Sequence, residues 1–81
     1  MKTAKYFSAT WCGPCRTFKP VIQEAIADGH SIEIVDVDEN QSLAQQYQIM
    51  SVPTLVIEQD GQIVDSVVGA TSKDDLIQRL S

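Results

Sequence analysis

Long apolar runs are missing from this sequence: among its 81 residues, no stretch of more than four consecutive residues is apolar. A membrane-spanning helix needs about 20 such residues, and a secretory signal needs about 7–15 behind a basic N-terminus. We therefore expect a cytoplasmic protein with no membrane partner. Internal repeats, linkers and low-complexity segments are also absent, which predicts a single domain over residues 1–81.

Positive charge is scarce. Six Lys and Arg residues stand against eleven Asp and Glu, so the net charge is −5, which argues against nucleic acid as a partner. The charge is also uneven, because residues 1–20 carry four of the cations and no acid, whereas residues 21–81 carry every acid. The basic end of the chain also holds both cysteines.

The apolar residues that are present predict a sheet. They make up 43% of the chain, which excludes a disordered protein, and Val and Ile dominate among them, as is typical of strands. The patterns predict strands over 2–8, 32–37, 54–58 and 62–67, and helices over 13–28, 40–47 and from Ser72 onward. This order, β-α-β-α-β-β-α, predicts an α/β fold with a four-stranded mixed sheet and helices on both faces.

Proline, glycine and turn-forming residues support several of these boundaries. Asp60-Gly61 is a hairpin signal between the last two strands. Pro14 suits the first turn of the 13–28 helix, Pro20 should kink it, and Gly29 should end it. The inward face of this helix is expected to hold Cys15, Phe18, Ile22, Ala25 and Ile26.

The motif Trp11-Cys12-Gly13-Pro14-Cys15 falls where a strand ends and a helix begins. The N-terminus of a helix offers unpaired N–H groups and a partial positive charge, and both favour a thiolate over a thiol. We therefore expect Cys12 to be the more exposed sulfur with the lowered pKa, and Cys15 to be more buried. This pattern favours dithiol redox chemistry.

Three other interpretations compete with redox chemistry. A structural disulfide closing so short a loop would remove only about 2 kcal/mol of unfolded-state entropy. A metal site needs about four ligands, whereas the chain has two Cys and a distant His30. Two inert core thiols would not explain the Gly-Pro insert or the nearby Arg16 and Lys19.

The chain resembles the thioredoxin family over most of its length. The resemblance is carried by Trp-Cys-Gly-Pro-Cys at 11–15, the helix-kinking Pro20, Val52-Pro53-Thr54 as the cis-proline segment, Gly61 in the hairpin, and Gly69-Ala70. It implies a minimal thioredoxin fold in which Pro53 is cis and packs against the disulfide. It also implies that the backbone of Val52 pairs with an extended substrate segment, in a groove lined by Trp11, Gly13, Pro14, Val52, Pro53, Gly69 and Ala70.

The activity that the resemblance implies is thiol–disulfide exchange with protein disulfides by Cys12 and Cys15. The chain would bind no cofactor of its own. It would act as a monomeric electron carrier, reduced by an NADPH-dependent flavoprotein, thioredoxin reductase, with ribonucleotide reductase as one candidate target. A glutaredoxin-like use of glutathione and a binding module without turnover are the alternatives.

The sequence also departs from the family pattern. Thioredoxins usually carry a strand and a helix ahead of the active-site strand, and this sequence begins at that strand. Tyr6 stands where thioredoxins bury an Asp that is thought to accept the proton of the second cysteine, and Ile34 stands where its Lys partner would be. The proton acceptor would then be solvent or a substrate group. Tyr6 itself is expected to be a packed aromatic, with a functional hydroxyl as the alternative.

Three expectations concern other residues. Trp11 should lie at the surface, where it would help to dock substrates. His30 is expected in an exposed loop without a catalytic role. Asp36, Asp38 and Glu39 are expected to solvate and protect an edge strand.

Overall fold

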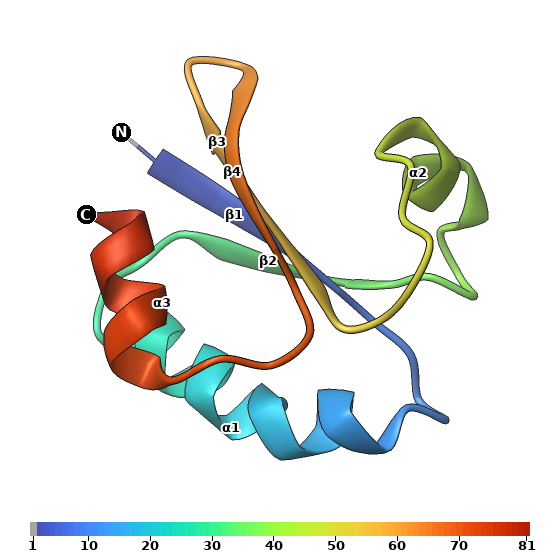
Figure 1. Ribbon diagram of the computed structural model, residues 1–81, viewed down its shortest axis with the longest axis horizontal. Helices are drawn as coiled ribbons and strands as arrows, with labels where there is room; N and C mark the ends of the chain where they lie inside the picture. Colours follow the sequence, from blue (N-terminus) through green and yellow to red (C-terminus); the bar gives the residue numbers. More distant parts are fainter. Residues whose placement is uncertain (1) are drawn as a thin grey trace.

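A computed structural model describes residues 2–81, and its seven elements follow the predicted order (Figure 1). They are β1 (Lys2–Ser8), α1 (Gly13–Ala27), β2 (Ile32–Asp36), α2 (Gln41–Gln46), β3 (Thr54–Gln59), β4 (Gln62–Val68) and α3 (Lys73–Leu80). The predicted α/β class and element order are confirmed.

The four strands form one mixed sheet in the order β2-β1-β3-β4. Strand β1 pairs with β2 in parallel and with β3 in antiparallel orientation, and β3 and β4 form an antiparallel hairpin. Strand β1, which precedes the cysteine pair, is therefore central, although it carries two charged residues, Lys2 and Lys5. The strands β2 and β4 form the two edges.

Helices cover both faces of the sheet, as predicted. Figure 1 shows α1 and α3 together on one side, while α2 lies apart from them. The larger core lies under α1 and α3, and its largest fully buried side chains are Tyr6, Ile22, Leu55, Ile57 and Leu76. This core holds the start of α1, and with it the cysteine pair, against the central strands.

A smaller core lies on the α2 side of the sheet, built on Phe7, Val35 and Val56. Beside it, Glu58 accepts hydrogen bonds from Lys5 Nζ and from the Tyr47 hydroxyl, both at 2.8 Å. The hydrogen bond and ion pair with Lys5 lower the pKa of Glu58, and Glu58 raises the pKa of Lys5 in return. Lys5, a polar residue of β1, is therefore paired on this face of the sheet.

Two local signals give the structure that the sequence predicts. Asp60 and Gly61 both have positive φ, 56° and 81°, which is the type I′ turn expected of Asp-Gly in a two-residue hairpin. Ser72 is the N-cap of α3, where its hydroxyl accepts the N–H of Asp75 at 3.1 Å.

A few expectations about burial and boundaries were wrong. Helix α1 ends at Ala27, one residue before the predicted end, with Asp28 as its C-cap; Gly29 follows with a φ of 104°, as expected of the glycine that ends the helix. Ile26 is 38% exposed, since it lies at the rim of the apolar stripe of α1, whose buried members are Cys15, Phe18, Ile22 and Ala25. Strand β2 ends at Asp36, one residue earlier than predicted, and His30 is half-buried in the loop that precedes it.

Candidate functional site

The two cysteines lie at the N-terminus of α1 and are joined by a disulfide, with their Cα atoms 5.3 Å apart. Cys12 is the N-cap residue, and Cys15 lies in the first turn. Both are buried, with 5% and 3% of their surfaces exposed. The expected difference in exposure is therefore slight in this disulfide form, because Val52 and Ala9 cover the pair from the other side.

The backbone around Cys12 favours negative charge on its sulfur. The N–H of Cys15 donates a hydrogen bond to Cys12 Sγ at 3.2 Å, as in a helix N-cap. The first turn of α1 contains no acidic residue. The helix dipole and this hydrogen bond act on the same atom, which is the arrangement that lowers the pKa of a cysteine thiol.

Arg16 has a structural role that the sequence did not reveal. Its Nε and Nη2 atoms both donate to the carbonyl oxygen of Thr10, at 3.0 and 2.7 Å. The guanidinium therefore braces the loop that carries Trp11 and Cys12. The charge of Arg16 contributes to the field near the cysteines, while its hydrogen bonds fix the shape of the loop.

The cis-proline segment lies directly opposite Cys12. The Val52–Pro53 peptide bond is cis, as the resemblance implied. Cys12 Sγ lies 3.8 Å from the carbonyl oxygen of Val52, and Pro53 is buried. The backbone N–H of Gly69 donates to the carbonyl oxygen of Pro53 at 2.8 Å, so the 69–70 segment is joined to the same site.

The structure therefore places Val52 against the disulfide and joins Gly69 to the neighbouring Pro53. Trp11, Gly13 and Pro14 are exposed next to the cysteines in the chain, and Ala70 is exposed next to Gly69. The indole of Trp11 is 67% exposed and is oriented by a hydrogen bond from its Nε1 to the Asp38 carboxylate at 2.8 Å. A shallow cavity of about 150 Å³ adjoins it, lined by Val37, Ala44, Ile49, Met50, Ser51, Val52 and Trp11.

Two residues of this region were missed by the sequence analysis. Asp38 orients Trp11, although it was expected only to solvate an edge strand. Met50 is 96% exposed beside the cavity. Local pattern could not identify either residue, because α2 and the loops around it determine where they lie relative to the cysteines.

A larger hollow lies on the opposite side of the start of α1. It has a volume of about 480 Å³ and is lined by Cys15, Arg16, Lys19, Ile34, Asp36 and Glu39, among others. Ile34, on the edge strand β2, is 38% exposed here. Apolar and charged residues alternate over Ile32-Glu33-Ile34, a pattern that is typical of a strand with its apolar side chains buried. Solvent therefore reaches the surroundings of Cys15 from this side, which suits solvent as the acceptor of its proton.

Tyr6 lies beneath the second cysteine. Its side chain is fully buried and packs edge-on against Phe18, with ring centroids 5.8 Å apart. Its hydroxyl donates to the carbonyl oxygen of Cys15 at 3.1 Å. Burial raises the pKa of Tyr6 to about 12, so the phenol is neutral at pH 7 and a poor base. Tyr6 is therefore a core aromatic whose hydroxyl is bonded to the backbone.

We expect Tyr6→Phe to leave the rate of disulfide exchange within a few-fold of the wild type. The substitution removes one buried hydrogen bond, which should lower the free energy of unfolding by about 0.5–1.5 kcal/mol. Exchange kinetics and urea unfolding of the same sample measure the two quantities. A loss of rate of about a hundredfold in a folded variant would instead give the hydroxyl a direct part in proton transfer.

Within residues 2–81, no three His, Cys, Asp or Glu side chains are grouped so that they could hold a metal ion. None of the helices described is long and apolar enough to cross a membrane. His30 lines a different surface hollow, with Lys2 and Leu80.

Comparison with known proteins identifies relatives over almost the whole chain. The thioredoxin family profile matches residues 4–81. A thioredoxin of Staphylococcus aureus is 49% identical over 77 residues, which are 91% of this chain and 74% of the relative.

Solved structures agree with the sequence comparison. A mutant thioredoxin from Halobacterium salinarum superposes with a TM-score of 0.89 and 41% identity, over 98% of this chain and 71% of that one. Thioredoxin from Fasciola hepatica gives a TM-score of 0.86 and 35% identity, over 99% of this chain and 81% of that one.

Proposed function

The chain belongs to the thioredoxin family, and from this premise we propose that it reduces protein disulfides with Cys12 as nucleophile and Cys15 as resolving thiol. It is a thiol–disulfide oxidoreductase of the thioredoxin type.

The observation that carries the assignment of roles is the hydrogen bond from the Cys15 N–H to Cys12 Sγ at the N-terminus of α1. In the reduced protein, this donor and the helix dipole stabilise a Cys12 thiolate. The thiolate attacks one sulfur of the target disulfide, and the other target sulfur leaves as a thiolate that takes a proton from solvent. A mixed disulfide between Cys12 and the target remains.

In the second step the Cys15 thiol loses its proton to solvent, and its sulfur attacks Cys12 Sγ. The bond between Cys12 and the target breaks, and the second target sulfur leaves as a thiolate. The target gains two electrons, and this chain becomes the Cys12–Cys15 disulfide. The hollow of about 480 Å³ that Cys15 lines supports solvent as its proton acceptor.

The substrate groove consists of the seven residues Trp11, Gly13, Pro14, Val52, Pro53, Gly69 and Ala70. An extended target segment lies along Val52, whose backbone pairs with it as with an added strand. The carbonyl oxygen of Val52 lies 3.8 Å from Cys12 Sγ, so a segment paired there carries its own sulfur close to the nucleophile. The exposed indole of Trp11 provides an apolar contact at one end.

The chain works without a bound cofactor, as a monomer in the cytoplasm. An NADPH-dependent flavoprotein, thioredoxin reductase, returns its disulfide to the dithiol. Its targets are proteins with accessible disulfides, ribonucleotide reductase being one candidate.

The test compares two electron sources for insulin disulfide reduction by this chain: NADPH with thioredoxin reductase, and glutathione with glutathione reductase. We expect rapid turnover with the first and little with the second. Faster turnover with glutathione would assign the chain to glutaredoxin-like chemistry. A Cys12→Ser, Cys15→Ser double variant that retains full biological function would show instead a binding module without turnover.

Alkylation distinguishes the roles of the two thiols. We expect iodoacetamide to modify Cys12 of the reduced protein first at pH 7, because the helix N-terminus stabilises its thiolate. Peptide mapping by mass spectrometry after short reaction times gives the order. Earlier modification of Cys15 would reverse the assignment.

A further inference from the structure

The segment between β4 and α3 contains the Gly69-Ala70 wall of the groove, yet burial in the core does not fix it. Residues 69–72 are Gly, Ala, Thr and Ser, and none of them is buried. Its first residue is held by the hydrogen bond from the Gly69 N–H to the Pro53 carbonyl oxygen at 2.8 Å. The far end of the segment must be held by other contacts.

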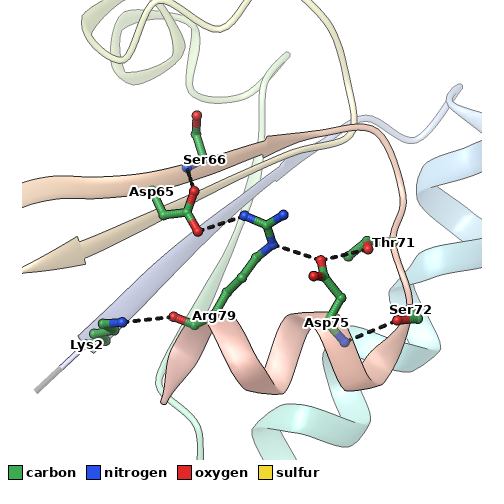
Figure 2. Close-up of polar contacts among 7 residues, drawn as sticks. All are labelled: Lys2, Asp65, Ser66, Thr71, Ser72, Asp75 and Arg79. Atoms are coloured by element: carbon green, nitrogen blue, oxygen red, sulfur yellow. Dashed lines mark hydrogen bonds and ion pairs between the residues drawn. The ribbon is translucent and has the colours of Figure 1, made fainter.

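Those contacts converge on Asp75, in the first turn of α3. The Thr71 hydroxyl donates to Asp75 Oδ2 at 2.8 Å, and the Asp75 N–H donates to Ser72 Oγ at 3.1 Å (Figure 2). Arg79 Nε donates to the same Oδ2 atom at 2.8 Å. The hydrogen bonds from Arg79 and Thr71 lower the pKa of Asp75, so it is a carboxylate at neutral pH.

Arg79 also contacts the strand that leads into the segment. Its Nη1 donates to Asp65 Oδ2 at 2.8 Å, while Asp65 Oδ1 accepts the N–H of Ser66. Figure 2 shows the guanidinium between the two carboxylates, with Asp65 on β4 and Asp75 on α3. Lys2 Nζ donates to the carbonyl oxygen of Arg79 at 3.2 Å, which joins this end of α3 to β1.

We propose that Arg79 is a positioning residue for substrate binding: by bridging Asp65 and Asp75 it holds Thr71, and through it the Gly69-Ala70 wall, in the shape that accepts a protein segment. The inference rests on the proposed function of the groove. The bridge joins the two elements that flank the 69–72 segment, so the segment has a fixed span between β4 and α3. Arg79 itself does not touch the disulfide.

The bridge should affect large substrates only. A protein segment that pairs with Val52 extends along the 69–70 wall, whereas a small disulfide needs only Cys12. Loss of Arg79 should therefore weaken the binding of a protein disulfide and leave the chemical steps unchanged. Because solvent screens ion pairs at the surface, the expected change in affinity is modest, about fivefold.

The experiment follows oxidation of the reduced chain by the fluorescence of Trp11, its single tryptophan, in stopped flow. Insulin and bis(2-hydroxyethyl) disulfide serve as the large and small substrates. We expect Arg79→Met to raise the half-saturating insulin concentration about fivefold, with its limiting rate unchanged and the small-disulfide rate unchanged. Arg79→Lys, which can still pair with one carboxylate, should lie between Arg79→Met and the wild type.

Lys73→Met is the matched control. Lys73 is on the same helix and also pairs with two carboxylates, those of Glu24 and Asp28, but these pairs join α3 to α1 and its loop. Its loss should leave both substrates unaffected. Thr71→Val removes the wall anchor while Arg79 stays in place, so it should reproduce the insulin effect, and combining it with Arg79→Met should add little.

The inference is overturned if Arg79→Met equals the wild type with insulin, or if Lys73→Met shifts insulin binding equally. It is also overturned if Arg79→Met slows both substrates alike, or if Arg79→Met and Thr71→Val act additively. Should Arg79→Met fail to fold, Thr71→Val decides alone. A wild-type chain that reacts with the small disulfide and not with insulin would instead refute the proposed function.

Discussion

The Cys15→Ser variant is expected to accumulate a covalent adduct with a protein disulfide, and the Cys12→Ser variant is expected to form none. Cys12 lies under the N–H of Cys15 at the start of α1, so it performs the first attack whether or not residue 15 carries a thiol. Without the Cys15 sulfur, the mixed disulfide has no nearby group to resolve it. Turnover with insulin should fall at least about a thousandfold in both variants.

Non-reducing electrophoresis and intact-mass analysis measure the adduct. An excess of a disulfide-containing protein is mixed with each reduced variant and quenched in acid. Adduct formation by Cys12→Ser, with none by Cys15→Ser, would exchange the two roles. Wild-type protein with both cysteines alkylated beforehand serves as the control, because it has no thiol that could form an adduct.

Tyr6→Asp is expected to lower the free energy of unfolding at pH 7 by about 3–5 kcal/mol, because it removes a buried ring and places a carboxylate in an apolar core. Tyr6 is fully buried, and its neighbours Phe18 and Leu55 offer no charge partner. Ile34 lies beside it in the register of β1 and β2, where a Lys would have been needed. For a small domain this loss is a large part of the total stability.

The pH dependence of this variant has a definite sign. Burial raises the pKa of the new carboxyl in the folded state above its unfolded value of about 3.9. Between these two pKa values the folded state binds more protons than the unfolded state. The free energy of unfolding of the variant therefore falls as pH rises from the unfolded pKa to the folded pKa. Urea unfolding at about pH 3.5 and at pH 7 should show a smaller deficit, relative to Tyr6→Phe, at the lower pH. A deficit that grows on acidification would contradict the burial of this position.

Much of the fold follows from short-range pattern. The Asp60-Gly61 turn, the Ser72 cap and the spacing of Phe18, Ile22 and Ala25 are local features, and each appears in the structure where the sequence indicates it. The cysteine pair was identifiable for the same reason, since five consecutive residues carry it. The cis bond before Pro53 came only from family resemblance, because nothing in the local pattern demands it.

The surroundings of the site were less accessible to sequence analysis. The contacts of Asp38 with Trp11, of Arg16 with Thr10 and of Arg79 with Asp65 depend on how separate elements lie in space. From the linear sequence, charged residues at such positions cannot be distinguished from ordinary surface charges. The exposure of Ile34 is of the same kind, since it depends on what lies beyond the edge of β2.

The central claim is that the Cys12–Cys15 pair carries two electrons to a protein disulfide. The most direct test mixes the fully reduced chain with an equimolar amount of insulin, quenches the mixture in acid and measures the intact mass and the thiols of both proteins. We predict that the chain loses two hydrogens, about 2 Da, with Cys12 joined to Cys15, and that insulin gains two thiols for each chain oxidised. A chain that keeps both thiols while insulin stays oxidised would contradict the account.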